Sequence, residues 1–189
     1  FKSNDFDWEL SEIISEKDDK IFYHPGNYFG KAWILLKSIL IRLNDLRRAK
    51  HFDIVFIQRE ALLIGSSYFE KHFFKKNKVI FDFDDSIWLL DTSPENKKFE
   101  FLKNPDKTKI NIAHAHCVIT GNLFLANYAK QFNQNTVVIP TTIDTNFHKQ
   151  KPELRGAEKI VIGWSGSIST IKHFEMAIPA LKQIQHKYP

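Results

Sequence analysis

Three acids, Asp82, Asp84 and Asp85, gather at the end of a short apolar run, with Asp82 inside the run and the other two directly after it. The run covers residues 78–83 and is bounded by turn formers, which predicts a buried strand with the acids at its carboxyl end. Open α/β sheets bind ligands beyond the carboxyl ends of their strands. Carboxylates placed there accept hydrogen bonds from a ligand or hold a metal ion, although acids after a strand also cap helices and solvate loops.

Polar groups also end three other predicted strands, over residues 53–58, 117–120 and 137–139. Helices are predicted between these strands, and alternating strands and helices indicate parallel βαβ units with right-handed crossovers. All carboxyl ends then share one edge, so the sequence predicts a single cleft there. The candidates for its wall are Arg59, Glu60, Asp84 and Asp85. Asp82, Thr120, Gly121, Asn122 and the segment 140–144 are expected along the same edge.

The helices that position this edge are predicted over residues 31–50, after the turn 65–67, over 95–115 with an interruption at 104–105, and over 121–131. The fold class is therefore α/β, a Rossmann-like parallel sheet with helices on both faces. In the first helix, apolar residues recur at helical spacing and are expected to pack on the sheet, with a membrane surface as the alternative. They are Trp33, Leu36, Leu40, Leu43 and Leu46.

A second unit is predicted near the end of the chain. Residues 1–150 form the first domain, the Pro- and charge-containing stretch 151–159 is a linker, and residues 160–189 form one strand and one helix. The turn between them contains Gly166 and Ser167, and Lys172 follows in the first helical turn. Free amides at a helix start can cradle a phosphate, although a plain tight turn explains the same residues.

Composition limits the classes of function. The 189 residues are 43% hydrophobic, enough for a core, and carry a net charge of +5. No basic block is interleaved with aromatics, so no nucleic-acid partner is expected. The lone cysteine, Cys117, lies in an apolar run and indicates a reducing compartment, and no secretion leader is visible, so a cytoplasmic location is expected. We also expect the chain to be a piece of a longer protein.

The ordered motifs resemble a retaining glycosyltransferase of the GT-B class, which uses nucleotide-sugar donors. The resemblance rests on the order of five motifs rather than on any one of them. They are FDIVFIQRE at 52–60, FDFDDSIW at 81–88, ITGN with LANYA at 119–129, VIPTTID at 138–144 and IGWSGS at 162–167.

The resemblance implies that residues 1–150 form the acceptor-side domain, lacking its opening strand, and that residue 160 begins a truncated donor domain. It also implies that Asp82, Thr120, Gly121 and Asn122 lie on the acceptor side of the cleft. The donor diphosphate would contact Gly166, Ser167 and Lys172, with Ser167 standing where the family has an arginine. The implied partners are a nucleotide sugar and a saccharide or lipid-linked acceptor. Peripheral contact with a membrane is the alternative interpretation of the helix over residues 31–50. No metal or other cofactor is implied, and the fragment alone should be inactive.

Three alternatives remain open. A phosphatase similar to the haloacid dehalogenases would use Asp82 as nucleophile, Asp84 as acid and Mg²⁺, with Thr120 in its second motif. A GT-A glycosyltransferase would bind Mn²⁺ at the triplet Asp82-Phe83-Asp84. A carbohydrate-binding or scaffold domain of the same fold would have no turnover.

Overall fold

A computed structural model describes residues 6–22, 24, 26–62, 64–89, 104, 106–149, 162–166 and 171–188. The chain divides into two compact units, Phe1–Thr142 and Ile143–Pro189, which are considered one at a time. The expected linker at 151–159 lies outside the described residues. The elements of the first unit are α1 (Glu16–Phe22), α2 (Tyr28–Arg48), η1 (Ala49–His51), β1 (Ile54–Gln58), α3 (Tyr68–Lys76), β2 (Lys78–Phe83), α4 (Asp106–His114), β3 (Cys117–Thr120), α5 (Leu123–Ala129) and β4 (Thr136–Val138).

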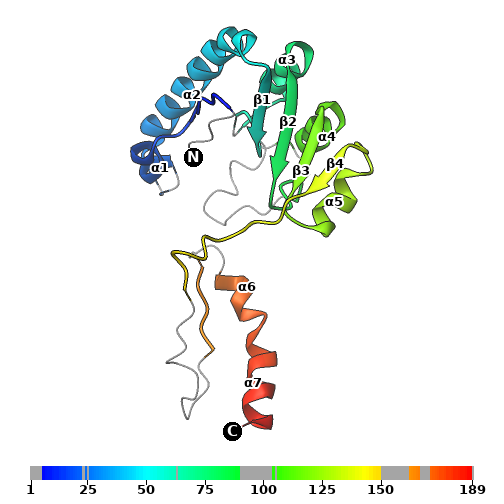
Figure 1. The fold of residues 1–189 in the computed structure, drawn as a ribbon. Helices are drawn as coiled ribbons and strands as arrows, with labels where there is room; N and C mark the ends of the chain where they lie inside the picture. Colours follow the sequence, from blue (N-terminus) through cyan, green and yellow to red (C-terminus); the bar gives the residue numbers. More distant parts are fainter. Residues whose placement is uncertain are drawn as a thin grey trace. The chain divides into compact units, whose positions relative to one another are not determined.

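The four strands form one parallel sheet in the order β1-β2-β3-β4 (Figure 1). The register places Gln58 beside Asp82 and Phe83 beside Thr120, so neighbouring strands end at a common level. The parallel α/β, Rossmann-like arrangement is thus confirmed. Strands β2 and β3 have the predicted bounds, and the other two differ from the prediction by one residue.

One face of the sheet forms the core. Val79, Phe81, Phe83 and Val118 are at most 1% exposed and cluster with apolar residues of the helices. Those helix residues are Phe69 and Phe73 of α3, Ile112 of α4, and Leu125 and Ala129 of α5. Right-handed crossovers between strands that follow one another in order place every connecting helix on the same face.

The opposite face of the sheet is open in the described part of the chain. Its side chains include Phe56 and Ile139, which are 57% and 56% exposed. The prediction of helices on both faces is therefore wrong for the described residues. The strand order does not reverse within this sheet, and a reversal is what moves a crossover helix to the other face.

Helix α2 buries a different side from the one that its apolar spacing predicts. Its buried residues are Ile34, Ser38 and Asp45. Ser38 Oγ donates to the carbonyl of Ile34, and the Arg42 guanidinium donates to Asp45, so this polar side is satisfied internally. Of the predicted apolar set, Leu46 packs against the core, whereas Trp33, Leu36, Leu40 and Leu43 are 43–65% exposed.

The helices after β1 have recognisable ends. Helix α3 begins after Ser67, as predicted, although the Ser67 hydroxyl makes no capping hydrogen bond. Helix α5 begins after Asn122, whose Oδ1 accepts from the amide of Leu125 at 3.0 Å. Helix α4 occupies the end of the predicted 95–115 region, and residues 90–103 and 105 lie outside the described ones.

The second unit contains α6 (Ile171–Glu175) and α7 (Ile178–Lys187), a broken form of the predicted helix. Pro179 lies in the first turn of α7, where its missing amide costs no hydrogen bond. The strand expected from residue 160 is not found at 162–166, where the described backbone has no regular structure. A strand needs a paired neighbour, and the described part of this unit offers none. None of the described helices is both long enough and apolar enough to cross a bilayer.

Candidate functional site

A hollow of about 390 Å³ lies at the carboxyl edge of the sheet, on its open face. Its lining combines apolar and polar side chains, as is typical of small-ligand sites. The residues that line it are Phe56, Gln58, Asp82, Asp84, Ile119, Gly121, Ile139 and Thr141.

Strand alternation explains why the polar side chains meet. On β2, Phe81 and Phe83 point into the core, so Asp82 between them points to the open face. Gln58 is its register partner on β1, and both line the hollow. Asp84, two residues after Asp82, lies on the same side of the chain.

Gly121 lets the hollow reach the sheet edge. A Cβ atom at this position would lie 3.4 Å from Asp84 Cβ and 3.7 Å from Thr141 Oγ1. These are ordinary contact distances, so alanine fits there, whereas a branched side chain would fill the space between Asp84 and Thr141. The predicted cleft residues Asp82, Asp84 and Gly121 are thus brought together.

The surroundings of the Asp82 carboxyl group change its pKa. Partial burial, and then the nearby Asp84 carboxylate, raise the pKa of Asp82 above its ordinary value of 3.8. The folded protein therefore binds this proton more tightly than the unfolded chain does, and stability decreases as pH rises from 3.8 through the raised pKa.

We expect Asp82→Asn to raise the thermal unfolding midpoint at neutral pH, because the variant places no charge in this partly buried position. The difference from the parent chain should disappear below pH 3.8, where the carboxyl group is neutral in both states. Thermal unfolding at the two pH values checks this. A parent chain that is more stable than the variant at neutral pH would contradict the burial of Asp82.

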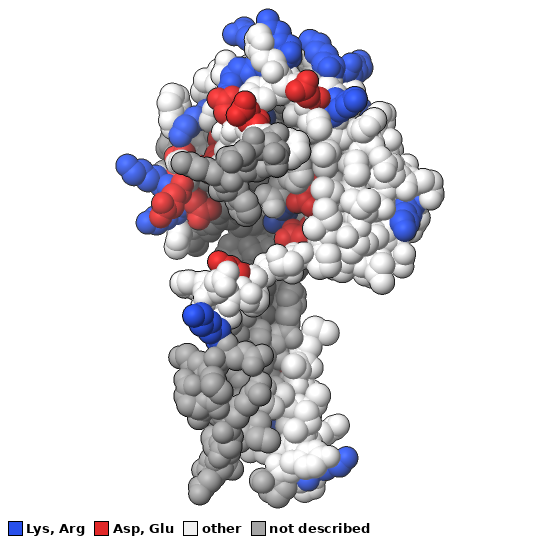
Figure 2. Space-filling view, viewed as in Figure 1, with Lys and Arg blue, Asp and Glu red and all other residues white. Residues whose placement is uncertain are grey.

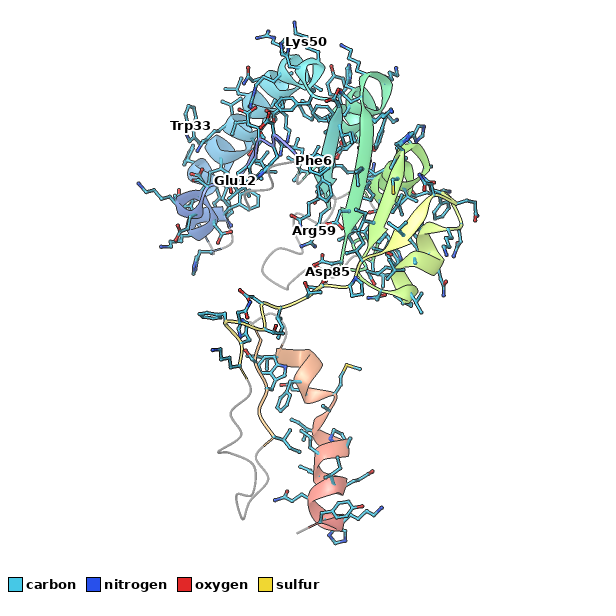
Figure 3. The ribbon with its side chains drawn as sticks, in the orientation of Figure 1. Phe6, Glu12, Trp33, Lys50, Arg59 and Asp85 are labelled. Carbon is cyan, nitrogen blue, oxygen red and sulfur yellow. The ribbon has the colours of Figure 1, made fainter. Side chains whose placement is uncertain are left out.

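Arg59 and Asp85 form an ion pair near this edge. Arg59 has a left-handed backbone, with φ of 64°, which is uncommon for a residue other than glycine. Its amide donates to the carbonyl of Asp82 at 2.7 Å, and its guanidinium lies 3.5 Å from the Asp85 carboxylate. Figure 3 shows both side chains beyond the carboxyl ends of β1 and β2. Both are more than half exposed, so the pair contributes little to stability and is accessible to a ligand.

The aromatic residues after β2 hold the acidic loop. Trp88 stacks on Tyr128 of α5 with ring centroids 3.7 Å apart and the planes 5° from parallel. Trp88 also meets Phe83 edge to face. These contacts fix the end of the loop that begins with Asp84 and Asp85, and so limit where the two carboxylates can move.

A buried polar network holds the loop after β1. Glu70 is fully buried and accepts a hydrogen bond from the amide of Ala61, and its carboxylate lies 3.0 Å from the Lys107 ammonium. The same ammonium is 3.3 Å from Glu60 and donates to the carbonyl of Leu62. Arg42 donates to the carbonyl of Ala61. The loop that carries Arg59 is therefore tied to α2, α3 and α4.

Three of the predicted cleft residues belong to the frame rather than to the hollow. Glu60 is paired with Lys107, and Asn122 caps α5. Thr120 is completely buried, and its hydroxyl lies within hydrogen-bonding distance of the carbonyls of Asn122 and Val137. Its position next to a strand end suggested the cleft, but strand alternation directs its side chain to the core face with Val118.

Four lining residues were not predicted, namely Phe56, Gln58, Ile119 and Ile139, whereas Thr141 belongs to the segment 140–144 that was expected at this edge. Gln58 and Thr141 add an amide and a hydroxyl, and Phe56, Ile119 and Ile139 add apolar side chains. The signal for Gln58 was its place as the last residue of a strand, on the same face as Phe56. The signal for Ile139 and Thr141 was the alternate spacing after β4, although the lateral register that brings them to Asp84 is not visible in the sequence.

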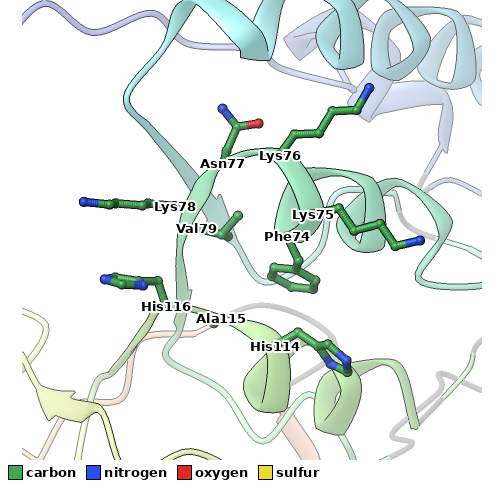
Figure 4. Close-up of a pocket in the computed structure, with 9 residues that line it drawn as sticks. All are labelled: Phe74, Lys75, Lys76, Asn77, Lys78, Val79, His114, Ala115 and His116. Carbon is green, nitrogen blue, oxygen red and sulfur yellow. The ribbon is translucent and has the colours of Figure 1, made fainter.

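A second hollow, of about 510 Å³, lies at the amino edge and is lined by residues 74–79 and 114–116 (Figure 4). Helices α3 and α4 both end there, so its lysines and histidines complement the negative ends of the helix dipoles. Figure 4 shows Lys75 and His114 pointing to one side and Lys78 and His116 to the other, so these groups do not converge on a ligand. Figure 2 shows acidic and basic side chains together at the opposite, carboxyl edge.

The three residues proposed to contact the donor phosphate lie in the second unit. Gly166 is exposed, Ser167 lies outside the described residues, and Lys172 lies in α6 with a side chain that is not among those described. Within the described ranges, no three His, Cys, Asp or Glu side chains gather as ligands for a metal ion. Comparison with known protein families finds no match to this chain, and neither does comparison with curated proteins.

Proposed function

We propose that this chain contains the acceptor-binding part of a glycosyltransferase that uses a nucleotide-sugar donor. The observation that carries the proposal is the hollow at the carboxyl edge, whose lining joins the polar side chains of Asp82, Asp84, Gln58 and Thr141 to three apolar ones. A parallel sheet collects its ligand groups at this edge, and the resemblance of the ordered motifs supports the same class.

A saccharide suits this lining because a sugar ring has apolar C–H faces and a rim of hydroxyl groups. The hydroxyls donate to the carboxylates of Asp82 and Asp84, and the Gln58 amide and Thr141 hydroxyl both donate and accept. Phe56, Ile119 and Ile139 would contact the apolar ring face. Arg59 and Asp85, whose ion pair is exposed, extend the polar surface for a longer acceptor.

The transfer step in this proposal breaks the bond between the sugar carbon and the donor phosphate and forms a bond to an acceptor oxygen. Positive charge develops on the sugar ring and negative charge on the departing diphosphate. Cations and backbone amides stabilise the diphosphate, and Lys172 is the candidate cation in this chain. The Asp82 and Asp84 carboxylates orient the acceptor hydroxyl, whose proton passes to the departing diphosphate as the new bond forms.

A Mg²⁺-dependent phosphatase is the second candidate, because Asp82 and Asp84 share the hollow as a nucleophile and an acid would. Thr120 weakens this candidate. Its hydroxyl is fully buried and bonds within the fold, whereas the phosphatase needs it at the phosphate.

The test uses the full-length protein, with nucleoside-diphosphate release measured from a panel of nucleotide sugars in EDTA. We expect release that does not require a metal and that decreases at least about 10-fold in Lys172→Ala, because one charge-assisted contact to the diphosphate is lost. The matched control is Lys182→Ala, which replaces an exposed lysine of α7 in the same unit and should retain full activity.

Hydrolysis of p-nitrophenyl phosphate with Mg²⁺ is measured in parallel. Activity there that is lost in Asp82→Asn would contradict the transferase and support the phosphatase. A scaffold without turnover would bind saccharides at the hollow while releasing no diphosphate from any donor.

A further inference from the structure

Helix α2 presents a row of large apolar side chains to solvent. Phe29, Trp33, Leu36, Leu40 and Leu43 are 93%, 65%, 47%, 56% and 43% exposed. Figure 3 shows Trp33 on the outer side of α2, away from the sheet. Scattered exposed apolar residues are ordinary, but five on one side of one helix indicate a surface that another molecule covers.

The row has the spacing of a helix-to-helix seam. Positions 29, 33, 36, 40, 43 and 47 alternate by four and three residues, the pattern that keeps a narrow stripe facing a second helix. The row ends in Arg47, which is also exposed. A helix that lies on a membrane has a broader apolar face with basic residues on its polar side. The side of α2 opposite this row is instead packed within its own unit through Ile34, Ser38 and Asp45.

The row is also symmetric about position 38. A two-fold axis there would place Leu36 against Leu40, Trp33 against Leu43 and Phe29 against Arg47 of an antiparallel second copy. The Trp33 ring would then contact the smaller Leu43 side chain, and the Phe29 ring the longer Arg47 side chain. The guanidinium of Arg47 would lie on the face of Phe29, a favourable cation–π contact. A parallel arrangement would oppose the two Arg47 charges.

The charges that flank the row do not obstruct this pairing. Lys37 is bonded to Asp18 at 2.7 Å, and Arg48 is paired with Glu9, both within one copy. Their charges are therefore partly neutralised before a second copy arrives, which lowers the repulsion between two basic helices.

We propose that α2 is the contact surface of a two-fold dimer of this chain, formed by the antiparallel seam of residues 29–47. The seam is short, and an interface of this size is of the weak, concentration-dependent kind. It lies on a helix distinct from the hollow, so it does not depend on the proposed function.

The first measurement is the molar mass of the chain in solution over a range of concentrations. We expect the mass to rise from 22.2 kDa towards twice that value. Leu40→Glu should keep the chain monomeric at every concentration, because it buries two unpaired carboxylates near the two-fold axis. Leu123→Glu, a change of the same kind at a 70% exposed position on α5, should dimerise like the parent. Circular dichroism shows that both variants are folded.

Cross-linking tests the antiparallel geometry, with Cys117 replaced by Ser. A mixture of Trp33→Cys and Leu43→Cys chains should form disulfide-linked dimers under mild oxidation, whereas each variant alone should not. Cross-linking of Trp33→Cys with itself would overturn the antiparallel seam. A parent chain that stays monomeric at every concentration would overturn the dimer. Co-sedimentation of a monomeric parent chain with phosphatidylglycerol vesicles, lost in Leu40→Glu, would also overturn it and would assign the row to a lipid surface.

Discussion

Asp84→Asn is expected to decrease sugar transfer by the full-length protein about 100-fold while leaving the fold unchanged. Asp84 lines the hollow beside Gly121 and Asp82, and its carboxylate accepts from the acceptor hydroxyl in the proposed complex. An amide keeps the shape but offers one acceptor oxygen and a donor in place of two acceptor oxygens. Misplacement of a reacting group by about 1 Å can decrease the rate about 100-fold. Steady-state kinetics with varied acceptor measures the effect.

Asp85→Asn is the matched control for Asp84→Asn. Asp85 is the next residue and also an acid, but its side chain is 64% exposed and pairs with Arg59 outside the hollow. We expect a change of only a few-fold, since exposed ion pairs contribute little. Equal losses in the two variants would mean that the whole loop matters rather than the hollow. An unchanged rate in Asp84→Asn would contradict its placement in the acceptor site.

Lys107→Met is expected to destabilise the protein by about 3–5 kcal/mol, the range seen when one partner of a buried ion pair is removed. The Lys107 side chain is 6% exposed, and the change would leave the fully buried Glu70 without its cation. Urea denaturation of the parent and variant measures the difference in free energy of unfolding.

Two further variants separate charge burial from loss of packing. Lys71→Met replaces an exposed lysine of α3 and should cost less than about 0.5 kcal/mol. The double variant Lys107→Met with Glu70→Met should be more stable than Lys107→Met alone, because no unpaired buried charge remains. A double variant that is less stable than the single one would show that the Glu70 bond to the Ala61 amide matters more than the ion pair.

The strands could be predicted because their apolar runs are short and end in turn formers. The bounds of β2 and β3 follow from this pattern alone, and the parallel order follows from the helices between them. The side of α2 that is buried could not be predicted in the same way. Its apolar row is the stronger periodic signal, yet the buried side mixes Ile34 with the polar residues Ser38 and Asp45. The Asp45 carboxylate there is satisfied by Arg42 and Ser11, which meet it only in the folded chain.

The site was predictable in part for a related reason. Asp82, Asp84 and Gly121 were identified from strand ends, and they do line one hollow. Glu60 and Thr120 share the same kind of position in the sequence but face Lys107 and the core. The direction in which these side chains face depends on side-chain alternation along the strand and on the left-handed backbone of Arg59. The spacing of polar residues in the sequence indicates neither of them.

Binding of a saccharide in the hollow at the carboxyl edge can be measured by chemical-shift mapping with NMR. The 22.2 kDa chain is titrated with a panel of mono- and disaccharides, and the perturbed amide signals are assigned. We predict perturbations that cluster at Gln58, Asp82, Asp84, Gly121 and Thr141 and that vanish in Gly121→Val. Perturbations confined to the amino-edge hollow at residues 74–79 and 114–116, or none with any saccharide, would contradict the account.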